Sequence, residues 1–480
     1  MSTSSLSDQS NLQSSFQAAL FALSLDRASA TPLHAQLTDA LRKLILSGRA
    51  PLGARLPASR MLAAELSISR MTATTALDQL TAEGYLEARA GSGTFVAADL
   101  PHIAPPRPAL ANTPLPKPRT PLPFHAAIPD LALFPHKLWA RHLERAWRAP
   151  DAAMLALPDP AGYAPLRRAI TEHLSAWRGM EVEPQQVILT SGAAEAFELV
   201  ARSLLAPGDT VLTEDPGFPP MRQAMQMTGL APLAQPVDED GFDIATAASR
   251  APDARAALVT PSRHYPLGLT LPLSRRLALI DWAQERDALI IEDDYDSEFR
   301  YVGQPLPALA ALDHGGRVFY IGSFSKLLSP ALRLAYLVVP RRRLEAVERT
   351  MGSFRHTASM VPQPALANFM QSGEFAVHLR RMRRIYARRQ KALLASLARH
   401  LPDHLVAQSE PSGMHIVARP GPALTRPDTE ISTLAANNGL TLRALSPYFE
   451  SNPQQGFIMG FAGFDESTLE SAVKRLAALL

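Results

Sequence analysis

The sequence predicts a multidomain protein in which a small helical module precedes a much larger α/β domain. Three observations support this prediction: helical spacing of apolar residues within residues 27–97, nine prolines from Pro101 to Pro123, and alternating strand and helix patterns after residue 125. A proline-dense stretch forms neither a helix nor an inner strand, so it should be a semi-extended spacer. We therefore expect a loose, polar tail over residues 1–26, domains over 27–97 and 125–480, and a linker over 98–124.

The composition narrows the class of protein. A chain of 480 residues with 46% hydrophobic content can build several cores. It contains no cysteine, which excludes disulfides and thiolate metal sites and fits a reducing cytoplasm. No stretch approaches the roughly 18 to 20 apolar residues that a membrane span needs. The histidines show no metal-ligand spacing, so we expect a soluble cytoplasmic protein without a metal.

The first module should contain three helices and a hairpin. The stretch TPLHAQLTDALRKLILSG places Leu37, Leu41, Leu44 and Ile45 on one helical face and ends at Gly48. Two further helices are expected over residues 59–66 and 69–84, each opening with a serine that can cap backbone N–H groups. The stretch YLEARAGSGTFVA then predicts two strands around a glycine-rich turn.

This order of helices favours DNA binding. A short helix, a tight turn and a second helix is the arrangement in which the second helix enters the major groove by its N-terminal end. A plain three-helix bundle with solvated arginines is the alternative. The segments TPLHAQL, ILSG, LPASRMLAAEL and SRMTATTALDQLTAEGYLEARAGSGTFV resemble the winged helix-turn-helix of the GntR superfamily.

The resemblance implies that the module binds a double-stranded DNA operator. At Thr74, where some relatives place an arginine, this chain differs, so the operator sequence stays open. The helix order and the resemblance together give these candidate DNA contacts, of which the last three form the tip of the wing: Arg60, Ser69, Arg70, Thr72, Gly91, Ser92 and Gly93.

The larger domain should contain a largely parallel sheet. Apolar strand patterns such as VILTSG, DTVLTED, AALVTPS, ALIIEDD, RVFYIGSFS and RLAYLVVP alternate with helical patterns. This alternation is typical of α/β domains.

A lysine in the stretch SFSKLLSPALRLAY indicates the chemistry of this domain. Lys326 could form an imine with an aldehyde cofactor, and pyridoxal phosphate also needs a phosphate cradle, an anion near its ring nitrogen and a stacking group. The segment TSGAA over residues 190–194 connects a strand to a helix start, which favours a phosphate. Asp293 ends an apolar strand, Tyr295 points to the same side, and Phe218 offers a flat face.

Each of these residues alone has an ordinary structural interpretation, but together they resemble a fold type I aminotransferase. The chain from residue 27 to 480 resembles the MocR subfamily of GntR regulators, also through LFPHKLWARHL, GYAPLRRAITEHL, EDPGF, EDDYDSEFRY and SGMHIV. The resemblance implies pyridoxal phosphate on Lys326 as an internal aldimine, with Asp293 at the pyridine nitrogen and Tyr295 at the ring oxygen. It implies a phosphate site formed by Ser191, Gly192, Ala193, Ser323, Ser325 and Arg333.

The chain departs from the pattern of this family at two places. Relatives usually read TPSHQ, an aromatic residue and proline, whereas residues 260–266 read TPSRHYP. The late strand GFIMGFAG lacks the arginine with which aminotransferases commonly hold a substrate carboxylate. Arg222, Arg263 and Arg443 are the remaining candidates for binding an anionic effector group, with a surface position as the alternative for each.

The basic run over residues 378–400 also has two interpretations. It predicts a helix that is either a solvated part of a smaller C-terminal lobe or a second DNA contact.

The resemblance implies a PLP-dependent DNA-binding transcriptional regulator, active as a homodimer. Its aminotransferase-like domain would sense an amine, an amino acid or a B6 vitamer. The alternatives are a catalytically active aminotransferase with an accessory DNA-binding module, and a DNA-binding protein whose second domain only dimerises.

Overall fold

The structure is a computed structural model that describes residues 16, 19–20, 22–89, 91–100, 120–126, 128–156, 158–354 and 358–480. The chain divides into two compact units, one up to Pro118 and one from Arg119 onward. Most of the tail predicted over residues 1–26 and of the linker predicted over 98–124 lies outside the described residues.

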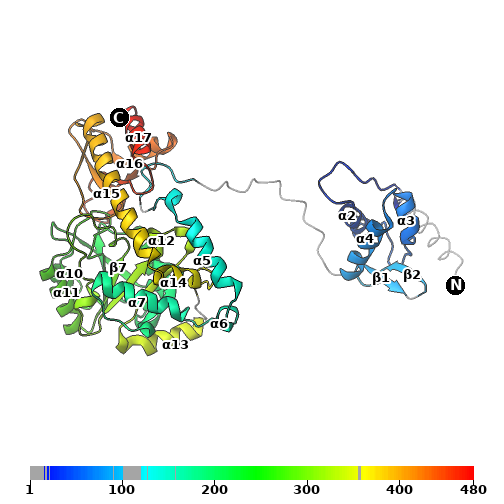
Figure 1. Cartoon of the computed structure of the whole chain (residues 1–480), viewed down its shortest axis with the longest axis horizontal. Coiled ribbons are helices and arrows are strands. Elements are labelled where there is room, and N and C mark those ends of the chain that lie inside the picture. Colours follow the sequence, from blue (N-terminus) through cyan, green and yellow to red (C-terminus); the bar gives the residue numbers. More distant parts are fainter. Residues whose placement is uncertain are drawn as a thin grey trace. The chain divides into compact units, whose positions relative to one another are not determined.

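Among the described residues, the N-terminal unit forms several helices and a two-stranded hairpin (Figure 1). Its elements are α2 (Leu33–Leu46), α3 (Ser59–Glu65), α4 (Arg70–Ala82), β1 (Leu86–Arg89) and β2 (Gly93–Val96). The two strands pair antiparallel, with Leu86 opposite Val96 and Arg89 opposite Gly93. The apolar face predicted for the first helix is buried in the core of this unit, which confirms the helical assignment.

Only one of the two predicted serine caps is present. Ser69 precedes α4 and its hydroxyl accepts a hydrogen bond from the Thr72 amide at 3.0 Å. Ser59, in contrast, lies inside α3, and the residue that precedes this helix is Ala58, which has no side-chain acceptor. The prediction that Ser59 caps its helix is therefore wrong.

The large sheet of the second unit has seven strands in the order β3-β9-β8-β7-β6-β4-β5. Five of them, from β8 to β5, pair parallel, while β9 pairs antiparallel with both β8 and β3. The predicted largely parallel sheet is confirmed. The strands are β3 (Val187–Thr190), β4 (Thr210–Asp215), β5 (Ala231–Pro236), β6 (Ala256–Val259), β7 (Leu289–Asp294), β8 (Val318–Ser323) and β9 (Ala335–Val338).

Helices cover both faces of this sheet (Figure 1). Alternate residues of one strand enter different cores: Ile291 packs with residues of α8, α9 and α13, while Ile290 packs with residues of α10 and α11. The helices around the sheet are α5 (His136–Arg148), α6 (Ala152–Leu155), α7 (Ala164–Arg178), α8 (Ala193–Leu204), α9 (Pro219–Met227), α10 (Ile244–Arg250), α11 (Leu273–Glu285), α12 (Phe324–Leu327), α13 (Leu344–Phe354) and α14 (Gln363–Gln371).

A smaller antiparallel sheet with the order β10-β11-β13-β12 completes the second unit. Its strands and helices are β10 (Leu405–Ala407), β11 (His415–Pro420), β12 (Arg443–Ala444), β13 (Phe457–Gly460), α15 (Glu374–His400), α16 (Asp428–Asn437) and α17 (Glu466–Ala477). Phe124, the last residue of the predicted linker, is fully buried, and its backbone forms a bridge with Gly460.

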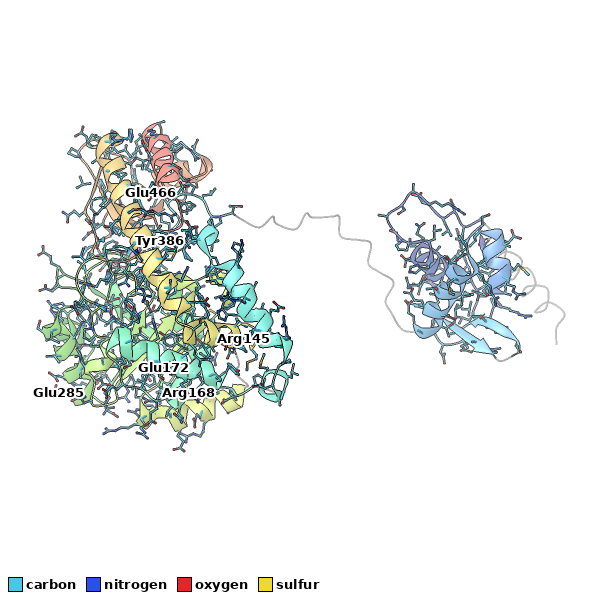
Figure 2. The ribbon with its side chains drawn as sticks, viewed as in Figure 1. Arg145, Arg168, Glu172, Glu285, Tyr386 and Glu466 are labelled. Carbon is cyan, nitrogen blue, oxygen red and sulfur yellow. The ribbon has the colours of Figure 1, made fainter. Side chains whose placement is uncertain are left out.

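The basic run forms the long helix α15, as predicted, which reaches from the larger layers to the smaller sheet (Figure 1). One face of α15 is buried: Tyr386, labelled in Figure 2, accepts a hydrogen bond from the Asp130 amide at 3.0 Å, and Arg389 pairs with the Asp130 carboxylate at 2.7 Å. On the exposed side, Arg388 pairs with Glu466 at the start of α17, at 3.4 Å. Glu466 is labelled in Figure 2. The helix therefore joins the two sheets.

Candidate functional site

A cavity of about 560 Å³ opens at the carboxyl ends of the parallel strands. This is the edge of an α/β sheet at which ligands bind, and the volume suits a small molecule. All ten residues predicted to hold the cofactor line this one cavity, although they come from five separate segments of the chain: Ser191, Gly192, Ala193, Phe218, Asp293, Tyr295, Ser323, Ser325, Lys326 and Arg333.

Lys326 lies on α12, the single helical turn that follows β8. The helix begins after Ser323, whose hydroxyl accepts a hydrogen bond from the Ser325 amide at 3.2 Å. Burial lowers the pKa of the Lys326 amine below its usual value, although the carboxylates of Asp296 and Asp293 act in the opposite direction. A lowered pKa favours the neutral amine, which is the nucleophilic form.

Asp293 lies near the end of β7, in register with Ile321 on the neighbouring strand β8. Burial raises the pKa of its carboxyl group to about 7, and the nearby Asp294 adds to this, while Lys326 lowers it. A cation beside this buried carboxyl group would stabilise its ionised form.

Another part of the cavity wall can hold a phosphate. Gly192 and Ala193 stand at the start of the twelve-residue helix α8, where backbone N–H groups point outward and the helix dipole favours an anion. Ser323, at the end of β8, and Ser325 and Arg333, which follow β8, line the same cavity. Arg333 holds a left-handed backbone conformation with φ of 48°, which is unusual for a residue with a side chain.

Aromatic residues form another wall of the cavity. Phe218 contacts Tyr265 edge to face, with 5.4 Å between ring centroids, and Tyr265 contacts Tyr295 in the same way at 5.7 Å. Phe218 is 41% exposed, so its ring can still be covered by a ligand.

These residues fit pyridoxal phosphate. Among the residues that the structure describes, neither Lys326 nor Asp293 has a side-chain hydrogen bond, and both face the cavity. The pKa of Lys326 is lowered and that of Asp293 is raised, and both shifts favour the neutral group. The cofactor would supply an aldehyde for the amine, a pyridine nitrogen for the carboxyl group and a phosphate for the start of α8.

The three candidate effector arginines occupy different environments. Arg443, on β12, lines the cavity, is half-buried, and lies 3.5 Å from the Tyr448 hydroxyl, which is its hydrogen-bond acceptor. Arg222 also lines the cavity but pairs with Glu450. Arg263 is neither a surface residue nor a cavity residue, because its side chain is buried and is not part of the cavity wall.

Sequence reasoning missed several residues of the cavity. Glu214 is buried at the end of β4 and accepts hydrogen bonds from the amide and the hydroxyl of Thr260, and burial raises the pKa of its carboxyl group to about 7. Both residues belong to motifs that were visible in the sequence, EDPGF and TPS. Tyr265 follows the same TPS motif, whereas His125, at the end of the linker, had no signal.

The candidate DNA contacts of the N-terminal unit remain accessible. Arg60 and Arg70 are exposed, and neither makes an ion pair with the carboxylates in the described part of the chain. Ser69 and Thr72 stand together at the start of α4, with 2.8 Å between their hydroxyl oxygens. Gly91, Ser92 and Gly93 form the exposed turn of the hairpin, and positive φ angles of 71° and 111° suit the two glycines.

The described residues contain neither a metal-binding cluster nor a membrane-spanning helix. No group of three or more histidine or acidic side chains there could hold a metal ion. No helix in the described ranges is long and apolar enough to cross a membrane.

Two family profiles match the two units. Residues 33–96 match the profile of bacterial regulatory proteins of the gntR family, and residues 139–476 match that of class I and II aminotransferases. The fold and the cavity thus define a protein with a GntR-type helix-turn-helix and a fold type I aminotransferase domain.

Full-length relatives share both parts. The chain is 39% identical over 471 residues to the probable rhizopine catabolism regulatory protein MocR of Rhizobium meliloti, covering 95% of each chain. It is 35% identical over 450 residues to the pyridoxine biosynthesis transcriptional regulator PdxR of Corynebacterium glutamicum, covering 93% of this chain and 96% of PdxR.

A solved structure resembles the second unit. It is LysN of Thermus thermophilus, an α-aminoadipate aminotransferase complexed with N-(5'-phosphopyridoxyl)-L-leucine. LysN is 27% identical with a TM-score of 0.67, and the match covers 74% of this chain and 91% of LysN.

The chain belongs to the MocR subfamily of GntR transcriptional regulators.

Proposed function

We propose that this regulator binds pyridoxal phosphate covalently at Lys326 and uses the cavity to sense an amine, an amino acid or a B6 vitamer. The observation that carries the proposal is the convergence of all ten predicted cofactor residues on one cavity. Such convergence from five segments is not expected of residues with only structural roles.

Each group around the cavity has a distinct task in this proposal. Lys326 would hold the cofactor through its aldehyde, Asp293 would keep a proton on the ring nitrogen, and Tyr295 would donate to the ring oxygen. Ser191, Gly192 and Ala193 bind the phosphate at the start of α8, with Ser323, Ser325 and Arg333. Phe218 packs on the ring. When bound, the cofactor supplies an electrophilic carbon that a free amine can also attack.

Among these effectors, the cavity favours one that carries an anionic group. Arg443 faces the cavity without a carboxylate partner among the described residues, whereas Arg222 is neutralised by Glu450. The hydroxyl of Tyr448 would then be displaced from Arg443, or would join it in binding the anion. Arg443 is thus the stronger of the two candidates.

The N-terminal unit binds operator DNA in this proposal. Arg60, Arg70, Ser69 and Thr72 contact phosphates and base edges in the major groove, and the hairpin tip at Gly91–Gly93 lies along the adjacent groove. In this proposal the protein is cytoplasmic and binds the operator as a homodimer. Two N-terminal units then contact one operator, so a change in the second unit of either subunit can alter operator binding.

An absorption experiment tests the cofactor site. Purified protein incubated with pyridoxal phosphate should become yellow, and borohydride reduction should fix the cofactor on the peptide that contains Lys326. Amines with and without a carboxylate or sulfonate group can then be screened by the same absorption. A protein that stays colourless and unmodified in excess cofactor would leave only the DNA-binding part of the proposal.

A catalytically active aminotransferase with an accessory DNA-binding module is the second candidate. Arg443 favours it, because β12 pairs with the late strand β13 and supplies beside it the arginine that β13 itself lacks. This candidate predicts steady transfer of an amino group from a donor to a keto acid. Regulation alone predicts a spectral response to the amine without sustained release of product.

A further inference from the structure

Arg263 stands behind Tyr295, on the side away from the cavity. Its side chain is only 3% exposed. The guanidinium donates from Nη1 to the Tyr295 hydroxyl at 3.0 Å, from Nε to the Ser412 carbonyl at 3.2 Å, and from Nη2 to the His415 carbonyl at 2.8 Å. Three separate acceptors therefore fix its orientation.

The surrounding chain makes room for this guanidinium. A Cβ atom at Gly413 would lie 2.1 Å from Nε of Arg263, so only glycine fits there, and its φ of 92° also requires glycine. Both ring nitrogens of His415 lie near Nη1 of Arg263, Nε2 at 3.2 Å and Nδ1 at 3.4 Å, and Nε2 also lies 2.9 Å from the Pro266 carbonyl. A neutral ring that donates from Nε2 to this carbonyl presents Nδ1 to the guanidinium as an acceptor. Burial and the charge of Arg263 keep the pKa of His415 well below its usual value, so this histidine is neutral.

The charge of Arg263 is only partly balanced. Asp296, 1% exposed, lies 3.8 Å from Nη1, and neither of its carboxylate oxygens has a hydrogen-bond partner among the described residues. The other titratable groups around the pair are Tyr265, Tyr301, His415, Glu410, Asp294 and Glu298, with Asp293 and Lys326 on the cavity side.

This arrangement determines which way the Tyr295 hydroxyl can point. A phenol has one proton to donate and accepts through its oxygen. Because Arg263 donates to that oxygen, the proton of Tyr295 is free to point elsewhere, and Tyr295 lines the cavity. A nearby cation also strengthens the phenol as a donor to an anionic acceptor.

We propose that Arg263 is a positioning residue that acts through Tyr295: it fixes the Tyr295 hydroxyl as a donor to the anionic ring oxygen of bound pyridoxal phosphate. The proposal rests on the proposed cofactor site. It also explains the TPSRHYP departure, in which the arginine supports the cavity wall and does not contact the effector.

The measurable consequence is the pH midpoint at which the visible absorption of the bound cofactor changes. A hydrogen-bond donor and a cation near the ring oxygen stabilise the negative charge of that oxygen. The oxygen then attracts the proton on Nζ of Lys326 less strongly. This proton is therefore lost at a lower pH, which lowers the midpoint. Replacing Arg263 with methionine should raise the midpoint by about one pH unit. R263K, which keeps the positive charge, should recover at least part of this shift.

The experiment is a spectral pH titration of full-length protein loaded with pyridoxal phosphate, as wild type, R263M, R263K, Y295F and R263M/Y295F. If Arg263 acts through Tyr295, R263M should add less than about 0.3 pH units in the Y295F background, because the two residues share one pathway. Full additivity, or an R263M midpoint within about 0.2 pH units of wild type, would overturn the proposal.

Two controls separate this inference from a structural role and from the cofactor proposal. R263M leaves Asp296 as an unpaired buried charge, which can prevent folding. The double variant R263M/D296N removes both charges and should fold even if R263M does not. A lower melting temperature with an unshifted midpoint in either variant would mean that Arg263 only supports the fold. Failure of the wild type to form a reducible adduct on Lys326 would instead refute the proposed cofactor site.

Discussion

At the scale of residues, the cavity depends on two groups of opposite ionic character that lack hydrogen-bond partners in the described protein, Lys326 and Asp293. Burial shifts the pKa of each group in the direction that favours its neutral form. The cofactor would supply an aldehyde for the amine and a ring nitrogen for the carboxyl group. An arrangement that is costly without a ligand and favourable with it is a mark of a binding site.

Replacing Lys326 with alanine should separate cofactor attachment from DNA binding. We expect K326A to keep its fold and its nonspecific affinity for DNA, because α12 lies in the second unit, while borohydride fixes no cofactor on the chain. Mass spectrometry of the reduced protein and binding to random DNA measure the two properties. A K326A protein that still responds to the effector would contradict the sensing role of Lys326.

Asp293 should make the cofactor-free protein less stable as the pH rises. Its pKa of about 7 in the folded state lies above the unfolded value of 3.8, so the folded state binds more protons between these values, and stability decreases with rising pH across this window. We expect the melting temperature of the cofactor-free wild type to fall between pH 5 and 7.5, and to fall less in D293N. An identical slope in both proteins would contradict the raised pKa of Asp293.

The sequence predicted the polar ends of the cavity better than its walls. Lys326, Asp293 and the start of α8 could be identified because their chemistry is tied to strand ends and helix starts. The place of Arg263 could not be predicted, because it depends on Gly413 and His415, which lie about 150 residues later in the chain. A buried charge looks the same in a sequence as an exposed one.

At the scale of elements, the first turn of α4 contains both a helix cap and candidate DNA contacts. Ser69 satisfies the amide of Thr72, and Arg70 follows it on the exposed side. The two serines predicted as caps provide a matched comparison, because only one of them makes the bond.

Replacing Ser69 with alanine should destabilise the N-terminal unit by about 1 kcal/mol, the usual cost of losing a helix cap. S59A is the control: Ser59 makes no cap in α3, so its replacement should change the free energy of unfolding by less than about 0.5 kcal/mol. Urea unfolding followed by helix circular dichroism measures both. Equal losses in the two variants would contradict the capping geometry.

Arg70 should contribute directly to operator binding. We expect R70A to weaken specific binding at least about tenfold if Arg70 reads a base edge, or to reduce the salt dependence by about one ion if it contacts a phosphate. K43A removes an exposed positive charge from α2 and should change the affinity little. Titrations of labelled operator at several salt concentrations distinguish these results. Equal effects of R70A and K43A would mean that α4 does not enter the groove.

The elements that the sequence did not resolve share a physical cause. The direction of β9 is set by pairing with β8 and β3, and its apolar residues would be buried in either direction. β5 contains two prolines and lies at the edge of the sheet, where missing N–H donors are tolerated. The pattern of apolar residues in a segment predicts that it forms a strand. The order and direction of the strands depend on pairing with segments that are distant in the sequence.

At the scale of the whole molecule, a regulator of this kind must couple two separate units. The candidate DNA contacts lie in the unit up to Pro118, and the cavity lies in the unit from Arg119 onward. An effector can alter operator binding only if it binds more tightly in one arrangement of the protein than in another. The coupling is therefore a difference between binding free energies, and it acts equally in both directions.

This reciprocity gives a prediction that needs no knowledge of the arrangement. If an effector amine changes the operator dissociation constant by some factor, saturating operator DNA must change the effector dissociation constant by the same factor. Fluorescence anisotropy of labelled operator measures the first factor, and the cofactor absorption measures the second in the presence and absence of DNA. We expect a factor of about 5 to 150, and no change in operator affinity when the amine is added to K326A. If the amine alters the absorption while DNA leaves its affinity unchanged, the cavity binds amines without regulating the N-terminal unit, and the aminotransferase alternative becomes the better account.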